Sequence, residues 1–405
     1  MNCRKTTLIA GGTAALACAL AGAAHAQTTP NCSDATMFPN PIYISGSSAF
    51  EPTAQAMGAK LAGLAGDAKV TLIYKATSSC DGPNSIRDNT TLTGTADTFV
   101  VDPADATKTK KLSCSLDAAV TKSDVGVSDI FYENCSGGGL TSTLSDTQGP
   151  IQAMIFIVPE VNTTSTNLTA EEGQDIWGCG MAGNVAPFTS DGDIQQRNAG
   201  SGTQGVVAKA INVPAGSFKG KTNAAGGDMV TSITTATNKD KAIGFLAADS
   251  YDTKRDQLNP LAFRAFGQTK AYYADSTADT FDKKNVRDGH YVVWGPEHFF
   301  AKIDATTKAI TNANAAKFIG WVNGTTPTAA FNYIQVEAAA GIVPQCAMKV
   351  KRTSDGGFLQ SYTPAAACGC FFESVATKTA TPPGCTVCAS DAICGAKHCL
   401  NGFCE

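Results

Sequence analysis

Histidine is scarce in this sequence, and so are charged residues. Four of the 405 residues are histidine, and 16% are charged. His290, His298 and His398 are the histidines beyond residue 26, and no two of them have the spacing of metal ligands. Acidic residues number 35 against 31 basic ones, so the chain lacks the basic excess of a nucleic-acid-binding protein. The sequence therefore disfavours histidine-based metal centres and nucleic-acid partners.

Long apolar runs are also missing after residue 26, where none reaches the roughly 18 residues needed to cross a bilayer. Before that point, an apolar run over 7–23 follows Arg4 and Lys5 and ends in Ala-His-Ala at 24–26. This pattern predicts a secretory signal peptide over 1–26. Without the two basic residues of the leader, 29 basic residues remain against 35 acidic ones, a net charge of −6. We expect a mature protein that is periplasmic, or cell-surface or secreted, and any anion site in it must be built from local groups.

Cysteine, in contrast, is abundant. Of the 15 cysteines, Cys3 and Cys18 lie in the predicted leader, which leaves 13, an odd number. In an exported chain these cysteines predict disulfides, and one thiol is left unpaired or joins another chain. Cys18 also follows Ala15-Leu16-Ala17, which offers an alternative in which the protein is a lipoprotein with lipid on Cys18.

Strands and helices are expected to alternate along most of the chain. Short apolar strands at 42–44, 70–74 and 125–127 each end in small polar residues. Strand, polar turn and helix is the rhythm of an α/β fold. Further strands are expected at 151–158, 242–246 and 291–294, and helices at 54–64, 169–177, 206–211 and 309–322, with Thr169 and Glu172 as a capping box.

The length predicts more than one folding unit, because about 380 mature residues are too many for one ordinary core. A Thr- and Asp-rich segment at about 90–119 is expected to form an inserted β-hairpin. The last segment, 385–404, holds five cysteines and is too short for a core of its own, so it predicts a disulfide-stapled module. The expected organisation is a discontinuous lobe 1 (27–155 and 275–370), lobe 2 (156–274), a linker (371–384) and this module.

Four short segments place glycine and small polar residues where a strand ends or a helix begins. A helix N-terminus exposes unpaired N–H groups and about half a positive charge, so it binds an anion without net positive charge around it. Each segment alone is a common turn or cap, and their order makes them informative. They are Ser45–Phe50, Thr77–Ser79, Val127–Asp129 and Arg197–Thr203.

In order and spacing, these segments resemble those of the phosphate-binding periplasmic proteins of ABC transporters. The opening glycine-serine turn of that family is matched at Gly46–Phe50, and its serine turn is matched loosely at Tyr74–Gly82. Gly126–Asp129 matches a Gly-x-Ser-Asp segment, and Ala242–Phe245 matches a later strand. The most specific match is Arg-x-x-Gly-Ser-Gly-Thr, which Arg197–Thr203 reproduces without gaps.

The resemblance spans about 41–343 and implies a two-lobed α/β fold of the type II periplasmic-binding-protein class. It implies a non-enzymatic protein without a cofactor, which captures inorganic phosphate or a related oxyanion and delivers it to an ABC permease in the inner membrane. Arg197 would form charge-assisted bonds to the anion. Asp129, which only accepts hydrogen bonds when ionised, would favour protonated phosphate over sulfate. The implied ligand-binding residues are Ser48, Ala49, Phe50, Ser79, Asp129, Arg197, Ser201, Gly202 and Thr203.

The match departs from the family pattern in three of these turns. Ala49 stands where many relatives carry threonine, which removes one hydroxyl donor unless Ser48 supplies it. Ala199 stands where some relatives carry an aspartate that holds the arginine. Cys80 and Asp81 replace glycine in the second turn and change the entrance of the expected site.

Two other functions fit parts of the sequence. A phosphate-ester hydrolase would need a serine with an oriented base, and Gly200-Ser201-Gly202 is not the Gly-x-Ser-x-Gly nucleophile elbow. The cysteine-rich tail favours the other alternative, a cell-surface binding or adhesion protein with the tail attached to a surface partner. Zinc on Cys385, Cys388, His398 and Cys399 is the metal interpretation of that tail, but disulfides are favoured in an exported chain.

Overall fold

A computed structural model describes residues 29–405 except 118–120 and 137–138. The predicted signal peptide over 1–26 and the alternative lipid site at Cys18 lie outside the described residues. Within them, no helix is both long and apolar enough to span a membrane. The helices are α1 (Glu51–Ala62), α2 (Asp81–Arg87), α3 (Tyr132–Ser136), α4 (Ala170–Cys179), α5 (Gly202–Ala210), α6 (Gly226–Thr234), α7 (Ala248–Asp252), α8 (Lys284–Arg287), α9 (Ala313–Val322), α10 (Tyr333–Ala340) and α11 (Gly369–Thr377).

One twisted sheet runs through the molecule, with strand order β10-β6-β13-β5-β1-β2-β3-β4 and β11 paired to β6. The strands β2, β1 and β5 at its centre are parallel, and the other pairs are antiparallel. Its members are β1 (Pro41–Ser47), β2 (Thr71–Thr77), β3 (Thr95–Asp102), β4 (Asp105–Ser115), β5 (Val125–Ser128), β6 (Leu144–Pro159), β10 (Gly244–Ala247), β11 (Leu258–Pro260) and β13 (Trp294–Lys302). The shorter strands are β7 (Asn167–Thr169), β8 (Gln195–Arg197), β9 (Lys221–Asn223), β12 (Ala262–Arg264), β14 (Val350–Lys351), β15 (Gln360–Ser361), β16 (Cys399–Leu400) and β17 (Phe403–Cys404).

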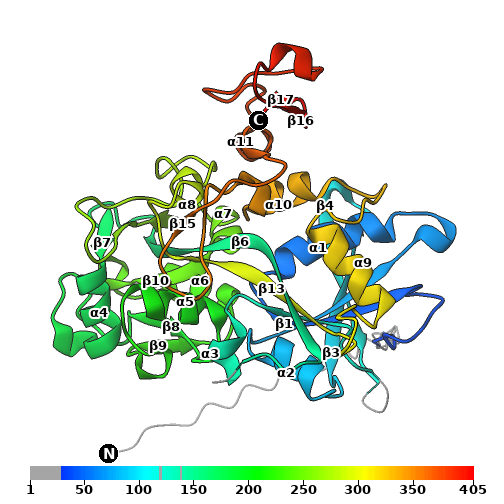
Figure 1. The fold of residues 1–405 in the computed structure, drawn as a ribbon. Coiled ribbons are helices and arrows are strands. Elements are labelled where there is room, and N and C mark those ends of the chain that lie inside the picture. Colours follow the sequence, from blue (N-terminus) through cyan, green and yellow to red (C-terminus); the bar gives the residue numbers. More distant parts are fainter. Residues whose placement is uncertain (1–28, 118–120, 137–138) are drawn as a thin grey trace, which may run out of the picture.

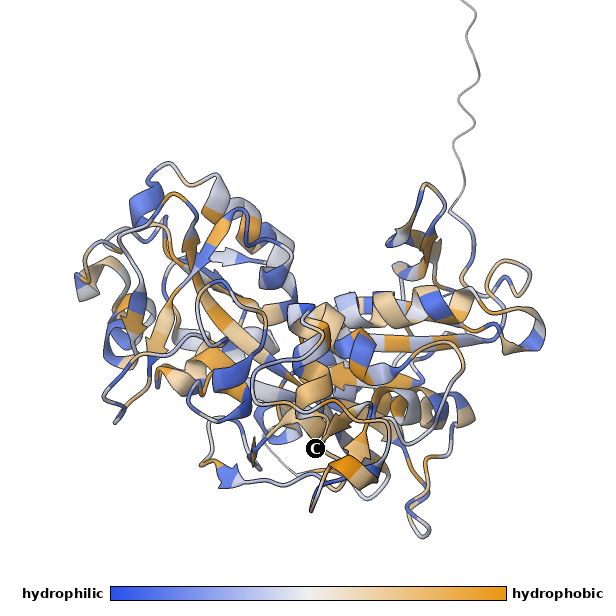
Figure 2. Cartoon of the chain, turned by 90° about the horizontal axis from the view of Figure 1, so that it is seen from above, coloured by the Kyte–Doolittle hydropathy of each residue, from blue (hydrophilic) through white to orange (hydrophobic). Residues whose placement is uncertain are grey.

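Two separate hydrophobic cores give the molecule its two lobes, which lie side by side in Figure 1. In one, Trp177 packs against Phe156 and Phe245 with ring centroids 5.6 Å apart in each pair. In the other, Phe50 meets Phe299 edge to face at 5.1 Å. The strands inside each lobe carry the apolar colouring in Figure 2. The long strand β6 contributes to the first core and also pairs with β13, so these two strands connect the lobes.

Most expected elements are present, with shifted ends. Helix α1 begins at Glu51 rather than at residue 54, because Pro52 occupies the first turn, where its missing N–H costs nothing. The strand expected at 291–294 is instead β13, which extends to Lys302. Glu297 and His298 are polar residues of β13 and are both fully buried, so they interrupt the apolar pattern from which the end of the strand was predicted.

The expected β-hairpin at about 90–119 is confirmed by β3 and β4, which pair antiparallel from Thr95 opposite Ser115. The hairpin continues the sheet beyond β2 and forms its edge. A disulfide from Cys32 to Cys114 attaches its second strand to the start of the described chain.

The predicted linker over 371–384 is wrong in its first part, because α11 runs from Gly369 to Thr377. Phe371, Phe372 and Val375 recur at helical spacing and pack on the core of the second lobe, which a Thr- and Pro-rich composition conceals. The described cysteines form six disulfides, and Cys179 is the exposed free thiol among them. The five tail cysteines form two internal pairs, and the fifth, Cys385, is bonded to Cys370 at the start of α11.

The capping box predicted at the start of α4 is present, and its contribution to stability can be tested. The Thr169 hydroxyl accepts from the Glu172 N–H at 3.1 Å, and the Glu172 carboxylate accepts from the Thr169 N–H at 2.8 Å. Thr169→Ala is expected to lower the free energy of unfolding by about 1 kcal/mol in urea titrations. The control is Thr231→Ala on the exposed side of α6, which should change it by less than about 0.5 kcal/mol. Equal losses in the two variants would contradict the capping role.

Candidate functional site

The sequence-predicted segments converge where the parallel strands end. Strand β1 ends at Ser47 and β5 at Ser128, and Ser79 follows the end of β2. The carboxyl ends of neighbouring parallel strands share one edge of a sheet, which is where ligands bind in open α/β sheets. Opposite this edge, α5 of the other lobe begins at Gly202. The site therefore lies between the two lobes.

A cavity of about 160 Å³ opens beside these segments. Four of the nine predicted ligand-binding residues line it, namely Ser48, Ala49, Arg197 and Thr203. The other lining residues are Glu51, Pro52, Gln55, Lys111, Ala225, Gly226, Gly227, Leu246, Ala247 and Ser250. The cavity thus has walls from α1, from the end of β8 and the start of α5, and from the start of α6.

Arg197 is the cation of the site and is only 6% exposed. Its Nη2 donates to the Ala224 carbonyl at 3.0 Å, and its backbone N–H donates to Gln204 Oε1 at 2.8 Å. Its Nε has no hydrogen-bond partner in the described part of the chain. Burial lowers the pKa of the guanidinium, and the charges of Asp129 and Asp228 oppose that shift. Arg197 is therefore held in place with donor capacity to spare.

Asp129 is a buried acid whose charge interacts with that of Arg197, and it is 2% exposed. Burial raises the pKa of its carboxyl, and hydrogen bonding to Ser47, the charge of Arg197 and hydrogen bonding to Ser79 offset only part of that rise. Its Oδ1 lacks a hydrogen-bond partner within residues 29–405 outside the two gaps. An ionised carboxyl here offers a free acceptor to a ligand that carries a proton.

Two of the predicted ligand groups bond to each other across the lobes. The Gly202 N–H donates to Ser79 Oγ at 3.0 Å. The Ser201 hydroxyl also has a local role, because it caps α5 by accepting from the Gln204 N–H at 3.5 Å. These groups are positioned at the helix N-terminus as expected, but in this conformation they satisfy one another.

Phe50 divides its roles between side chain and backbone. Its ring is fully buried in the core of the first lobe, against Phe299 and Phe318. Its backbone forms the N-cap of α1, and its carbonyl accepts from the Ala54 N–H at 3.0 Å. Next to it, the Ala49 N–H donates to Ser47 Oγ at 3.0 Å.

Two parts of the cavity wall were not predicted from the sequence. Lys111 reaches it from the inserted hairpin and forms a 2.5 Å ion pair with Glu51. The start of α6 adds a second helix N-terminus, where Asp228 accepts from the Ala225 N–H at 3.0 Å. The charge of Asp228 also acts on Arg197. Asp228 therefore supplies a carboxylate that acts on the arginine, a role that an aspartate at the position of Ala199 has in some relatives. The consecutive glycines 226–227 were the available signal for this turn.

Three further polar side chains are buried close to the site, two on the connecting strands β6 and β13 and one in α7. Gln152, Asp249 and Glu297 are each no more than 1% exposed. Burial raises the pKa of Asp249 to about 8 and raises that of Glu297 well above its usual range, and the charge of Asp129 adds to both shifts. Sequence patterns passed over all three, because each stands alone in an apolar strand or turn.

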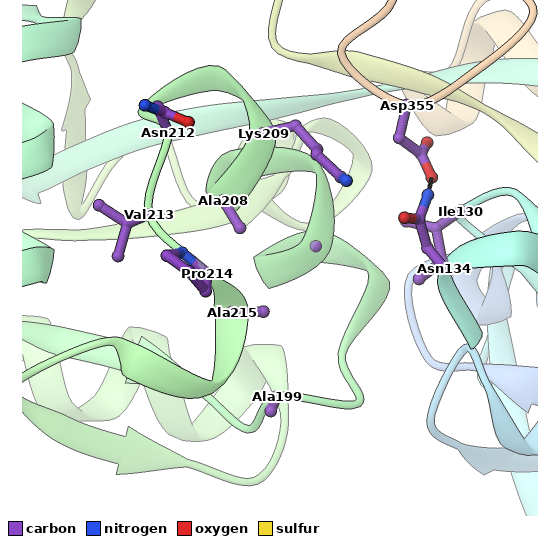
Figure 3. Close-up of a pocket in the computed structure, with 11 residues that line it drawn as sticks. Ile130, Asn134, Ala199, Ala208, Lys209, Asn212, Val213, Pro214, Ala215 and Asp355 are labelled. Atoms are coloured by element: carbon purple, nitrogen blue, oxygen red, sulfur yellow. Dashed lines mark hydrogen bonds between the residues drawn. The ribbon is translucent and has the colours of Figure 1, made fainter. Parts of the chain in front are cut away.

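A larger cavity, of about 360 Å³, lies along the other side of α5 (Figure 3). Lys209 and Asp355 face each other across its rim, and Asp355 accepts a 2.5 Å hydrogen bond from Asn134. Ala199 lines this cavity rather than the one that Arg197 lines. The residue that would hold the arginine in some relatives is thus turned to a different space.

No family model matches the sequence, and no curated protein matches it either. Solved structures do match. A phosphate ABC transporter substrate-binding protein from Clostridium perfringens, with bound phosphate, aligns with a TM-score of 0.50 at 14% identity, covering 75% of this chain and 99% of its own. An ABC-type phosphate transport receptor from Vibrio cholerae aligns with a TM-score of 0.46 at 14% identity, over 75% of this chain and 99% of its own.

The chain has the two-lobed fold of type II periplasmic binding proteins. At 14% identity the likeness establishes the fold alone. This fold explains why the core around Phe50 is built from two separate parts of the chain and why two strands connect the lobes. The β3–β4 hairpin and the disulfide-rich tail are additions to it. Six disulfides agree with an extracytoplasmic location.

His298 and three of the tail cysteines have structural roles. His298 is fully buried between Phe131 and Phe300, and its Nδ1 lies 2.7 Å from Asp146. Such a ring cannot reach a substrate in the cleft. The zinc interpretation of the tail meets a similar obstacle, since Cys385, Cys388 and Cys399 all form disulfides and are not thiolates.

Gly202 should tolerate no side chain. A Cβ there would lie 2.7 Å from Asp129 Cβ and still closer to Ser79 Oγ. Gly202→Ala is expected to cost on the order of 2 kcal/mol by overpacking, measured by thermal unfolding. Gly227→Ala at the start of α6 is the matched control, because its Cβ would meet nothing within 4 Å. If both variants unfold at the wild-type temperature, the close approach of the lobes at Gly202 is wrong.

Asp249 predicts a pH dependence of stability. Its folded pKa of about 8 lies above the ordinary value of 3.8, so the folded state holds a proton that the unfolded state releases between these values. Stability from this group is complete below about pH 4 and is lost as the pH rises through about 8. In urea unfolding, the wild type should lose on the order of a few kcal/mol of its free energy of unfolding between about pH 5 and 8, and Asp249→Asn should not show this loss.

The exposed Asp67→Asn is the control for that measurement and should keep the wild-type pH dependence. An Asp249→Asn variant that loses as much stability as the wild type over this range would show that Asp249 is not the titrating group.

Proposed function

We propose that this chain is an extracytoplasmic solute-binding protein that holds inorganic phosphate, or a related oxyanion, between its lobes for ABC-type uptake. The observation that carries the proposal is the pairing of Arg197 with the buried Asp129 beside the N-terminus of α5. A cation and a helix N-terminus attract an oxyanion, and a carboxylate at the same place accepts only from an anion that still carries a proton.

The anion would take over contacts that the lobes now make with each other. With a ligand present, the Ser79 hydroxyl and the Gly202 N–H would turn from each other to its oxygens. Arg197 Nε, the Thr203 hydroxyl and the N–H groups at the start of α5 would add donors. Ser48, Ala49 and Phe50 would close the site from the first lobe through their backbone and the Ser48 hydroxyl.

Asp129 would choose between oxyanions. Phosphate near neutral pH retains a proton and can donate it to the carboxylate, whereas sulfate is fully ionised and would be repelled. The Ser47 and Ser79 hydroxyls and the charge of Arg197 oppose the effect of burial on the pKa of Asp129, and so favour the ionised form.

Capture would involve a hinge motion of the lobes about β6 and β13. We take lobe 1 as 27–155 with 275–370, and lobe 2 as 156–274, as the sequence predicts. Hinge closure around a ligand is a common motion of two-lobed binding proteins. The closed form would then be presented to a permease in the inner membrane.

The tail is proposed to contact a surface partner. In Figure 1 the segment that carries β16 and β17 projects from the two lobes next to α11. The disulfide from Cys370 to Cys385 fixes its base, and Val387 and Ile393 expose more than half of their side-chain area. A chain that ends before residue 379 should bind phosphate as the full chain does, and lose retention at the cell surface if the tail anchors it.

Calorimetry on the mature chain tests the ligand. Phosphate is expected to bind with a dissociation constant on the order of micromolar or tighter, with sulfate, molybdate and tungstate at least about 100-fold weaker. Arg197→Ala should weaken phosphate by at least about 100-fold, because charge-assisted hydrogen bonds contribute roughly 1.5–3 kcal/mol each.

Arg264→Ala is the control for the loss of a positive charge in the same lobe. Arg264 is partly exposed and lies 3.4 Å from Glu171, and it does not line the cavity. Arg264→Ala should leave the affinity for phosphate unchanged. Failure of all four oxyanions to bind the wild-type chain would contradict the proposed function, and hydrolysis of a chromogenic phosphate ester would favour the enzyme alternative.

A further inference from the structure

The connecting strand β13 contains an irregularity directly beneath the site. Its pairing with β6 runs from Trp294 opposite Ala153 to Pro296 opposite Ile151, and then shifts before His298. Glu297 is the residue at this β-bulge. A bulge turns a side chain away from the alternation of a regular strand, and bulges are frequent next to functional sites.

The bulge directs Glu297 into a fully enclosed place. The residue is 0% exposed, and neither carboxyl oxygen has a hydrogen-bond partner among the described residues. β13 pairs antiparallel with β5 so that His298 lies opposite Ser128, which places Glu297 beside Asp129, and the two carboxyl groups interact. An ionised Glu297 would thus be an acceptor without donors beside a second carboxylate, which is among the most costly arrangements in a protein interior.

Charged groups on the neighbouring elements do not resolve this conflict. Asp249 at the start of α7 adds another acid, and its charge raises the pKa of Glu297 further. Tyr74 on β2 donates its hydroxyl to the Ser47 carbonyl at 2.5 Å and is not free for Glu297. Arg197 acts on Asp129, with its Nη2 already bonded to Ala224.

A proton on the Glu297 carboxyl removes this unfavourable arrangement of buried acids. A protonated Glu297 has an O–H donor, and the neighbouring Asp129 carboxylate can accept from it and still accept from a ligand, because its two oxygens offer about four lone pairs. A metal ion is a poorer solution. In the part of the chain that the structure describes, the three-residue group with metal-binding spacing is Cys388, Cys394 and Cys404, which form disulfides.

We propose that Glu297 is a positioning residue whose protonated carboxyl donates a hydrogen bond to Asp129 and keeps Asp129 an ionised acceptor in the cleft. The selection of a protonated oxyanion then depends on two acids, because this hydrogen bond opposes the effect of burial on the pKa of Asp129. This role in selection rests on the proposed function, but the protonation of Glu297 does not.

Two substitutions test whether position 297 needs a hydrogen-bond donor or an acidic group. Glu297→Gln keeps a donor toward Asp129, and Glu297→Leu keeps the volume without one. By calorimetry at pH 7, E297Q should bind phosphate within about threefold of the wild type, whereas E297L should weaken it at least about tenfold. E297L should also narrow the ratio of phosphate to sulfate affinity at least about tenfold, because a protonated Asp129 can donate to sulfate.

Infrared spectroscopy on the ligand-free protein tests the protonation directly. The wild type minus E297Q difference at pH 7 should contain the carbonyl band of a protonated carboxylic acid. Glu337→Gln is the matched control. Burial raises the pKa of this acid on α10 too, but Glu337 does not line the proposed site. Its own band should disappear from the spectrum while phosphate and sulfate affinities stay at wild-type values.

The outcomes of the two measurements are distinguishable. A difference spectrum without the band overturns the inference even if phosphate binds as proposed. Loss of phosphate affinity in E297Q equal to that in E297L overturns it as well, since the acid rather than the donor would then matter. If the band is present but the wild type binds no oxyanion, the proposed function fails and the proton on Glu297 stands.

Discussion

The attraction between Arg197 in one lobe and Asp129 in the other is the interaction on which the proposed site depends. Both side chains are more than nine-tenths buried, and each opposes the pKa shift that burial imposes on the other. The pairing is incomplete, because Arg197 Nε and Asp129 Oδ1 have no partner within the described residues. A buried pair with unused donors and acceptors is costly on its own, and it is suited to a ligand that supplies both.

Two long strands, β6 and β13, connect the lobes that carry Arg197 and Asp129. β6 and β13 pass between the cores, so residues on them lie below the cleft whichever lobe moves. Gln152 on β6 and Glu297 on β13 are buried there, in a region where a purely apolar strand would be more stable. We propose that these buried polar groups lower stability and keep Asp129 an acceptor for the ligand.

Much of this architecture could be predicted from the sequence, because its signals are local. A strand that ends in serine or glycine, or a Thr169–Glu172 capping box, is determined by neighbouring residues, and these elements are found. Glu297 could not be found, since an acid inside an apolar strand looks like an interruption until the bulge and its neighbour are seen. Lys111 reaches the cavity only because of the way in which the β3–β4 hairpin packs, which the sequence does not show. Helix α11 was missed because the Thr- and Pro-rich composition of its segment predicts a linker. The parity of the cysteines predicted one free thiol, but only the fold identifies it as Cys179.

A crystal structure of the mature chain with phosphate tests the central claim most directly. Phosphate is expected between the lobes, with its oxygens about 2.7–3.2 Å from Arg197, from the N–H groups at the start of α5 and from Asp129. The Ser79 hydroxyl should then be within reach of the anion rather than of Gly202. Phosphate bound in the larger cavity beside Lys209, or in the cleft without contact to Asp129, would contradict the account.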